Sequence, residues 1–133
     1  MLESGACELA AGRISDADLK NLYLELESMR AAHDTHDVAA FVAADLAFHD
    51  LILRASENVF VAVLFAPLHR VLERRRTETS KVREIQAHAI GHHQKIADAL
   101  ATRDPHQARD AMDAHMQQTL DDLKAYVLAD RPA

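Results

Sequence analysis

Residues 45–49 read Asp-Leu-Ala-Phe-His, and they lie in a stretch whose apolar side chains recur at helical spacing. Phe41 and Ile52 share one face of the predicted helix with the phenylalanine of this stretch, and Asp45 falls on that face. His49 follows Asp45 by one helical turn, so the two side chains lie one above the other. A carboxylate on a core-facing stripe has to be paired, hydrogen-bonded or bound to a metal, because burying it alone is strongly unfavourable. This stretch therefore predicts a polar site inside a helical core.

The composition of the chain is typical of a soluble all-α protein. The 133 residues are enough for one domain with a proper hydrophobic core. Hydrophobic residues make up 49% and charged residues 27%, which is the balance of a folded chain rather than a disordered one. Three glycines and three prolines leave few turns, and no stretch shows the sustained alternation of a strand. We therefore predict one all-α domain over residues 1–133.

Charge and residue usage exclude several classes of function. The formal net charge of −6 argues against a grip on nucleic acid, and 5% aromatic residues without tryptophan argue against a platform for stacking bases. The longest apolar run, residues 59–68, is about half of the ~20 residues that a membrane span needs. The start of the chain lacks the pattern of a signal peptide. Cys7 is the single cysteine and suits a reducing compartment, so we expect a cytoplasmic protein without a membrane partner.

Capping and breaking residues predict an antiparallel bundle of about six helices. The connections between them are short, which places consecutive helices side by side in opposite directions. Pro67 falls inside the fourth helix and predicts a kink there. The apolar stripe of this helix is expected at Val61, Leu64, Phe65, Leu68 and Leu72. The expected helices cover residues 2–11, 15–32, 37–55, 58 to a break at 79 or 80, 82–100 and 105–128.

Two histidines of the last helical hairpin are expected to face each other. His93 and His115 are 22 residues apart, and the midpoint between them is residue 104, where the turn is predicted. Antiparallel helices folded about that turn place the two side chains at the same height. Each histidine also lies on the apolar stripe of its helix. The hairpin therefore predicts a pair of buried imidazoles.

The same reasoning brings Asp45 and His49 to that height. In antiparallel helices, residues that are equally far from the turn lie at the same height along the bundle. Counting in this way across the breaks near residues 56 and 79 places Asp45 and His49 at the height of about residue 94, beside His93 and His115. One carboxylate and three imidazoles suit a divalent transition metal, zinc or nickel rather than calcium or magnesium. Four ligands from three helices could leave coordination positions open for water or a small ligand. We therefore predict a central cavity that holds a metal and its ligand.

Two other hypotheses stay open for these residues. An Asp/His pair one turn apart is commonly a local hydrogen bond, so the cluster could belong to a metal-free structural or dimerisation bundle. A metal-dependent enzyme acting on a small carboxylic acid is a third hypothesis. It is weakened because no second carboxylate is placed as a general base, and because the H-E-x-x-H and G-x-S-x-G motifs are absent.

One arginine is a candidate ligand-binding residue. Residues 74–76 are all arginine, and such a run is by default a solvated face. Arg75, however, lies three residues beyond Leu72 on the predicted inner stripe. It could therefore face the cavity and anchor an anionic ligand.

Four segments of the chain resemble motifs of one domain family. Residues 45–58 resemble its D-x-x-F-H-x-x-[LI]-x-x-A-S-x-N signature, and residues 93–100 resemble its E-H-x-x-I-x-x-A-[IL] motif. Residues 108–116 resemble its A-x-x-x-M-x-x-H-[LM] motif, and residues 2–11 its L-E-x-x-A-x-x-L-A-A start. The motifs occur in order and span almost the whole chain. The family is the C-terminal effector-binding (FCD) domain of FadR-type regulators, which belong to the GntR family of bacterial transcription factors.

The resemblance implies an all-helical bundle that binds a small organic acid in a central cavity and forms the regulator's homodimer. In metal-binding members of the family, the ligands correspond here to Asp45, His49, His93 and His115, the same four residues that the height argument selects. The leading hypothesis is therefore a ligand-sensing and dimerising module, not an enzyme. In it the metal holds the acid, and occupancy shifts the positions of the helices.

The chain departs from the family's pattern in two places. His92 stands where the family usually has glutamate, which alters the charge beside His93 without removing a ligand. The winged-helix DNA-binding domain that normally precedes this domain is absent from the chain, so DNA is expected to be contacted only through such a domain. The first helix also begins without a cap, which suggests a chain cut from something longer, although a truncated stand-alone form stays open.

Overall fold

The computed structural model describes residues 2–65, 67 and 69–128, and it is all-α. No strand occurs among these residues, so the predicted fold class is confirmed. This part of the chain forms seven α-helices rather than about six, and the last continues as a π-helical segment, Leu123–Leu128. The α-helices are α1 (Leu2–Ala11), α2 (Asp16–Asp34), α3 (Val38–Ala55), α4 (Val59–Phe65), α5 (His69–Thr79), α6 (Arg83–Thr102) and α7 (Pro105–Asp122).

Polar side chains cap the starts of four helices, as the sequence predicts. Ser15 accepts a hydrogen bond from the Asp18 backbone N–H at 3.1 Å, and Asp37 accepts one in the first turn of α3 at 3.0 Å. Asn58 accepts two backbone hydrogen bonds at the start of α4, and Asp104 does so at the start of α7. Each cap satisfies backbone donors that a helix leaves unpaired at its first turn. Short-range chemistry therefore determines where these helices begin.

The predicted fourth helix is divided into two helices. Instead of kinking one helix, Pro67 lies between the end of α4 and the start of α5. The physical reason is that proline lacks the backbone N–H that continues a helix and also restricts the residue before it. Because the helix is interrupted, the inward-facing side of α5 does not continue from that of α4. The buried positions of α5 therefore cannot be predicted by counting from α4.

The apolar stripe expected on this segment is only partly buried. Val61 is buried and Leu72 is partly buried, but Leu64 is exposed, which contradicts its expected place in the core. Leu68 lies outside the described residues, as does the side chain of Phe65. Among the described side chains of α4, only that of Val61 is therefore buried against the bundle.

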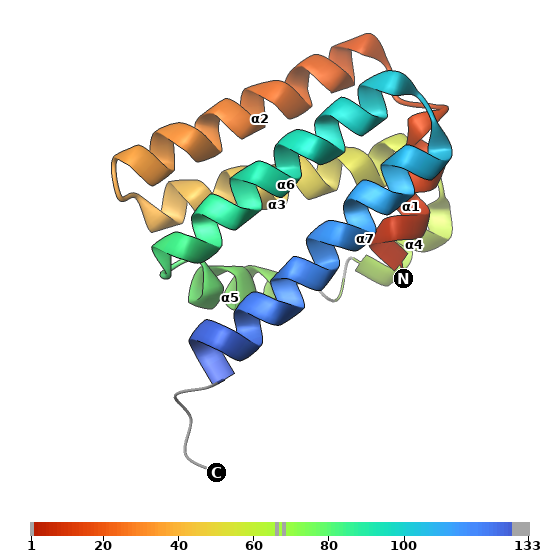
Figure 1. Cartoon of the computed structure of the whole chain (residues 1–133). Coiled ribbons are helices and arrows are strands. Elements are labelled where there is room, and N and C mark those ends of the chain that lie inside the picture. The colour runs from red at the N-terminus through yellow and green to blue at the C-terminus, as the bar shows by residue number, and fades with distance from the viewer. Residues whose placement is uncertain (1, 66, 68, 129–133) are drawn as a thin grey trace.

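Helix α6 is the central element of the bundle. It packs against α2 on one side and α7 on the other, and α2 also packs on α3 (Figure 1). Helix α1 packs on α7, α3 and α6 and covers one end of the bundle, and α5 packs on α3. The α6–α7 hairpin turns at Asp104, as the sequence predicts. Consecutive long helices run antiparallel, so the predicted bundle topology is confirmed.

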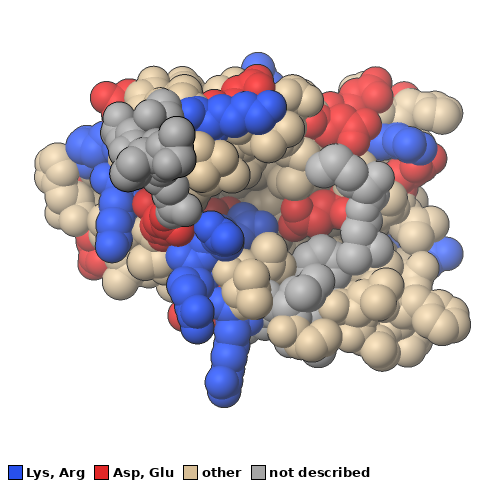
Figure 2. All heavy atoms as spheres, turned by 90° about the horizontal axis from the view of Figure 1, so that it is seen from below, with Lys and Arg blue, Asp and Glu red and all other residues tan. Residues whose placement is uncertain are grey.

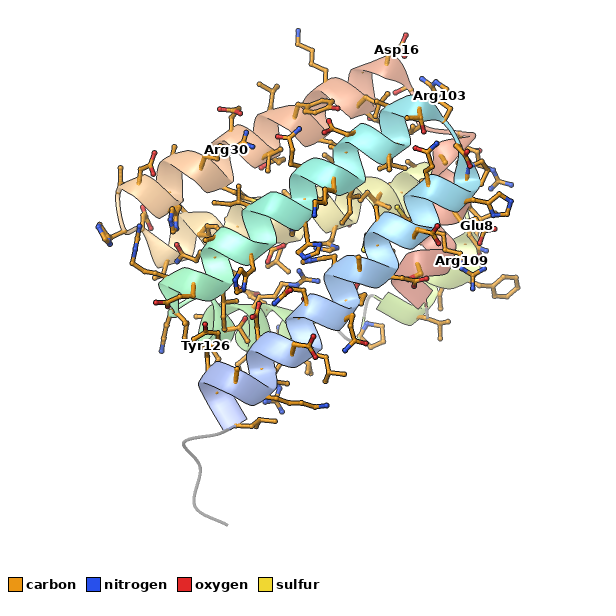
Figure 3. The ribbon with its side chains drawn as sticks, in the orientation of Figure 1. Glu8, Asp16, Arg30, Arg103, Arg109 and Tyr126 are labelled. Carbon is orange, nitrogen blue, oxygen red and sulfur yellow. The ribbon has the colours of Figure 1, made fainter. Side chains whose placement is uncertain are left out.

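Two ion pairs fasten neighbouring helices at the surface. Arg109 of α7 lies 3.1 Å from Glu8 of α1, and Arg103 at the end of α6 lies 2.8 Å from Asp16 at the start of α2 (Figure 3). Exposed pairs of this kind contribute about 0–1 kcal/mol each, so they fix orientation more than stability. The stability of the bundle has to come from its core.

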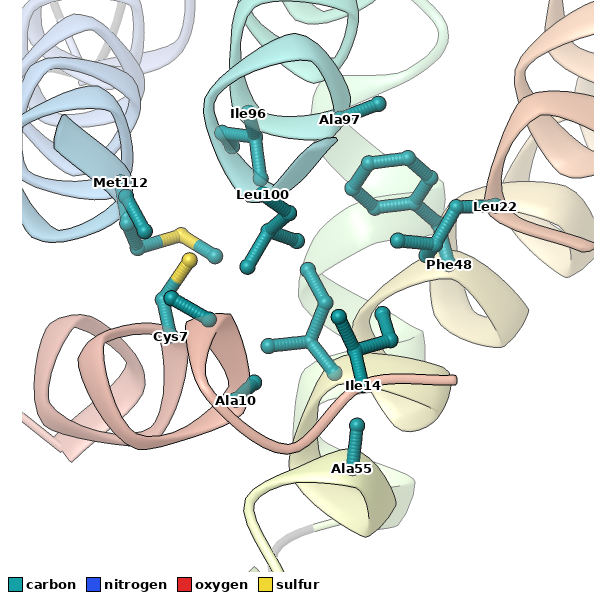
Figure 4. Close-up of a cluster of buried hydrophobic side chains, with 13 residues drawn as sticks. Cys7, Ala10, Ile14, Leu22, Phe48, Ala55, Ile96, Ala97, Leu100 and Met112 are labelled. Atoms are coloured by element: carbon teal, nitrogen blue, oxygen red, sulfur yellow. The ribbon is translucent and has the colours of Figure 1, made fainter. Parts of the chain in front are cut away.

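The core consists of two apolar clusters that α3 connects. The larger cluster gathers side chains from α1, α2, α3, α6 and α7 (Figure 4). Its largest buried members are Ile14, Leu22, Phe48, Ile52, Ile96, Leu100 and Met112. The smaller cluster contains Met29, Ala32, Phe41 and Ala44. Along α3, Asp45 stands between the residues of the two clusters, so the polar site interrupts the apolar core. A central cavity stays a prediction.

Replacement of Leu22 by alanine is expected to destabilise the protein by about 2–5 kcal/mol, because it removes a fully buried side chain and leaves a cavity. Leu24→Ala on the same helix removes an exposed leucine and should change the free energy of unfolding by about 0.5 kcal/mol or less. Urea denaturation followed by circular dichroism measures both. Equal losses in the two variants would contradict the assignment of the core face of α2.

Candidate metal centre

The structure brings the four predicted ligand residues together in the middle of the bundle. Asp45 and His49 come from α3, His93 from α6 and His115 from α7, and all four are buried. One nitrogen of each histidine lies within 4.8 Å of the others. Asp45 Oδ1 is 2.9 Å from His93 Nε2 and 3.3 Å from His49 Nε2. The four residues that were predicted from the sequence to lie at one height in the bundle are therefore neighbours in space.

The hydrogen bond of His93 to the backbone decides which of its nitrogens is free to bind. Its Nδ1 lies 2.6 Å from the carbonyl oxygen of Ala89, which can only accept, so Nδ1 carries the proton. Burial lowers the pKa of His93 and outweighs the nearby Asp45, so the ring is neutral. Nε2 then holds a lone pair and faces the carboxylate of Asp45. Either a proton or a metal ion has to lie between two acceptors at this distance.

His49 is oriented in the same way by a carboxylate. Its Nδ1 lies 3.1 Å from Glu3 Oε1, while its buried Nε2 has no hydrogen-bond partner among the described residues. Burial and Arg76 disfavour the charged ring, but Glu3 and Asp45 outweigh them and raise the pKa of His49. A carboxylate or carbonyl on the outer nitrogen of a histidine is the usual support of a metal ligand. Both His49 and His93 have this support.

His115 is the third histidine of the cluster, and its imidazole is neutral. Burial, followed by the neighbouring His93 and His49, holds the pKa of His115 well below its usual range. Its buried Nδ1 has no hydrogen-bond partner in the part of the chain that the structure describes. The ring centroid lies 4.7 Å from that of His93 and 5.4 Å from that of His49. A buried polar atom without a partner requires an explanation, and a bound cation is one.

The donor set fits a divalent transition metal. Despite its burial, Asp45 is ionised, because Arg76 and the two histidines beside it hold its pKa well below the ordinary value. One carboxylate oxygen and three imidazoles are ligands that zinc and nickel accept, whereas calcium and magnesium prefer oxygen alone. The residues present therefore fit the metal that the sequence predicts. They would hold it at the junction of α3, α6 and α7.

Two residues of the site were not found from the sequence. Arg76 Nη1 donates to Asp45 Oδ1 at 3.0 Å, and Nη2 lies 3.5 Å from Glu3 Oε1. Glu3 reaches the site from the first turn of α1, and its pKa falls to about 2, because His49 and Arg76 outweigh the opposing effect of burial. No local pattern connects Glu3 with residues more than 40 positions away. Arg76 could have been predicted only if the side of α5 that faces the bundle had been known.

The expected inward position of Arg75 is wrong. Its side chain is 62% exposed and lies 3.7 Å from Glu78 on the surface of α5, whereas the side chain of Arg76 is only 16% exposed. The expectation counted from Leu72 along an uninterrupted helix, and the break at Pro67 invalidates that count. The arginine that faces the polar cluster is therefore Arg76, one residue further on.

His92 lies at the edge of the same cluster. Its ring centroid is 5.8 Å from that of His115, and its buried Nδ1 has no partner among the described residues. Burial and then Lys95 lower its pKa, so it stands beside the centre as a neutral ring. The side chain therefore contacts one expected ligand without joining the group of three histidines that converge.

Residues 1–118 match the sequence profile of the FCD domain. The chain belongs to this family. FCD domains of GntR regulators bind effectors and dimerise, and they are not an enzyme family, so the predicted family and the prediction that the chain is no enzyme are confirmed. Among the described residues, no helix is long and apolar enough to cross a membrane.

Two bacterial transcriptional regulators are similar to the chain in sequence. The uncharacterized HTH-type transcriptional regulator YcbG of Bacillus subtilis (strain 168) is 26% identical over 122 residues, which cover 92% of this chain and 50% of the relative. The HTH-type transcriptional regulator LutR of the same organism is 28% identical over 131 residues, which cover 95% of this chain and 59% of the relative. The FCD chain thus spans between half and three-fifths of the length of these relatives.

Two solved structures resemble the chain in fold. Streptococcus agalactiae GntR superposes with a TM-score of 0.69 at 23% identity, over 88% of this chain and 52% of that one. E. coli McbR/YncC gives a TM-score of 0.73 at 20% identity, over 92% of this chain and 62% of that one. At these identities the likeness establishes the helical fold alone.

Replacement of Arg76 by alanine in metal-free protein is expected to destabilise the fold by about 3–5 kcal/mol, because it removes the arginine that compensates the buried charges of Asp45 and Glu3. Arg75→Ala removes an exposed arginine of the same helix and should change stability by about 0.5 kcal/mol or less. Thermal and urea unfolding in the presence of a chelator measure both variants. A larger loss for Arg75→Ala would show that the orientation of α5 is wrong.

Proposed function

We propose that this FCD domain is the ligand-sensing and dimerising part of a GntR-type transcriptional regulator. Asp45, His49, His93 and His115 hold a divalent transition metal, zinc or nickel, and the metal binds a small organic acid as effector. The observation that carries the proposal is the group of three histidines whose nitrogens lie within 4.8 Å of one another. Two of them, His49 and His93, lie beside Asp45 Oδ1 and are held in place by outer partners. Metal at this position supplies a Lewis-acidic centre to which a carboxylate binds.

Arg76 is the residue of this chain best placed to receive the carboxylate of the effector. It replaces Arg75 in that role, because its guanidinium lies beside Asp45 inside the bundle. A guanidinium binds a carboxylate through two parallel hydrogen bonds, which fixes the orientation of the acid as well as attracting it. Its Nε is buried and has no partner among the described residues, so one donor is free for such a ligand.

The same arginine offers a route from effector binding to movement of the helices. Arg76 of α5 lies close to Asp45 of α3 and to Glu3 of α1, so it connects three helices through two carboxylates. An acid that takes hydrogen bonds from Arg76 competes with these contacts. Such a ligand favours a different arrangement of α1 and α5, which is the differential affinity that a sensor needs.

We expect DNA to be recognised by a winged-helix domain that lies outside residues 1–133. The net charge of −6 disfavours attraction of this chain to a phosphate backbone, and the longer relatives are HTH-type regulators. The regulator would work in the bacterial cytoplasm as a homodimer. The domain itself would sense the acid and bring two DNA-binding domains together.

A metal-free structural bundle is the second candidate. One observation favours it, because Arg76 and His93 both lie within hydrogen-bond distance of Asp45 Oδ1 and compensate its charge without a metal. In that case the histidines would contribute to stability alone. Metal analysis separates the two candidates.

Untagged protein purified without chelators is expected to contain about one zinc or nickel per chain, and both His49→Ala and His93→Ala should lose it, because each removes one of only four ligands. His106→Ala, at an exposed position at the start of α7, is the matched control and should keep the metal. Plasma mass spectrometry of the dialysed proteins measures the content. Protein that takes up no metal after incubation with zinc or nickel would refute the metal site and leave the structural bundle.

The metal-loaded domain is expected to bind one of a set of 2-hydroxy- and 2-oxo-carboxylic acids without consuming it. Arg76→Lys keeps the positive charge but loses the paired hydrogen bonds, so the dissociation constant should rise about tenfold or more. Arg75→Lys should leave it unchanged. Isothermal titration calorimetry measures affinity, and chromatography of the acid after incubation measures turnover. Consumption of the acid would contradict a sensing role.

A further inference from the structure

Helix α4 leaves an apolar face uncovered. Val59 is 73% exposed, Phe60 80%, Val63 64% and Leu64 56%, and these values are high for side chains of this kind. The four residues form two pairs with a spacing of one helical turn, so they lie along one side of the helix. Among the α4 side chains that the structure describes, Val61 alone is buried. Four of the five described side chains of α4 therefore face away from the bundle.

The area of this face matches the apolar part of a protein interface. At these exposures the four side chains present on the order of 400 Å² of apolar surface, which is as large as the largest patch on a typical monomer. A stable dimer buries about 800 Å² on each partner, and a little over half of that area is apolar. The α4 face therefore supplies most of the apolar core that such an interface requires. It would need a polar rim around it.

The surroundings of α4 suit a second copy of the same chain. The segment Val59–Phe65 contains no charged residue, so two copies related by a two-fold axis bring no like charges together at the centre. The exposed side of α5 next along the chain carries both signs of charge, including Arg70, Arg74 and Glu73. Figure 2 shows an uncharged area beside a group of basic side chains on the face viewed from below. A polar rim with both charges is compatible with pairing to itself.

We infer that the face of α4 formed by Val59, Phe60, Val63 and Leu64 is the core of the interface between two copies of this chain. The inference rests on the homodimer of the proposed function and specifies where its interface lies. The two α4 helices pack against each other across a two-fold axis, and Phe60 is the largest side chain that each copy inserts. Because α5 follows α4 and carries Arg76, the interface adjoins the helix that reaches the metal centre.

The test compares one charged substitution on α4 with the same substitution elsewhere. Sedimentation velocity over a range of protein concentrations should show the unmodified chain as a dimer. Phe60→Asp should raise the dimer dissociation constant at least about 30-fold, as expected for a central interface residue. Leu24→Asp is the matched control, because Leu24 is 54% exposed on α2 and lies outside the α4 face, and it should remain as dimeric as the unmodified chain. Val63→Asp provides a second variant of the same face, and circular dichroism verifies the helical content of each.

Two results would overturn the inference. One is an unmodified chain that is monomeric throughout, which would leave the face to a different protein. The other is a dimer that both Phe60→Asp and Val63→Asp leave intact. Metal content is measured on the same samples, so the two proposals fail separately: a monomeric Phe60→Asp protein that keeps its metal supports both, and a dimer without metal supports the interface alone.

Discussion

The burial of one carboxylate constrains the arrangement of the whole bundle. Asp45 lies on the core face of α3, between the two apolar clusters, and its charge requires partners from other helices. Arg76 brings α5 to it and His93 brings α6, while Glu3 holds both Arg76 and His49 from α1. Removal of any one of these partners would leave a charge inside the protein. The polar centre thus fixes helix positions that apolar contacts alone leave adjustable.

Much of the fold follows from local sequence because local chemistry determines the helix ends. Ser15, Asp37, Asn58 and Asp104 satisfy backbone donors within three residues of themselves, so their effect does not depend on the rest of the chain. The proximity of His93 and His115 followed from the same information, since a tight turn between two straight helices determines which residues lie opposite. Antiparallel pairing extends that reasoning to α3.

The incorrect predictions concern positions whose orientation or partners do not depend on neighbouring residues in the sequence. The helix is interrupted at Pro67, so the inward-facing side of α5 cannot be counted from α4, and Arg76 rather than Arg75 faces the centre. Leu64 has the spacing of a core residue and is nevertheless exposed, because burial depends on whether another surface covers α4. The whole of α2 separates Glu3 from His49 along the chain, and only the packing of α1 brings them together. Local patterns specify elements, whereas tertiary contacts decide these positions.

The polar centre is hard to explain as a device for stability. Replacing a buried ion pair with apolar side chains of similar volume commonly leaves a protein equally stable or more stable. Among the described residues, His49 Nε2, His115 Nδ1 and Arg76 Nε are buried without a hydrogen-bond partner, and each unsatisfied group costs about 1–3 kcal/mol. A bundle built for rigidity alone would fill this level with apolar side chains, as it does around Ile96 and Leu100. Several unsatisfied buried atoms in one polar cluster are instead expected where a ligand completes the structure. Binding of the ligand then stabilises the arrangement of helices that presents those atoms. In this way ligand occupancy changes the conformation of a sensor domain.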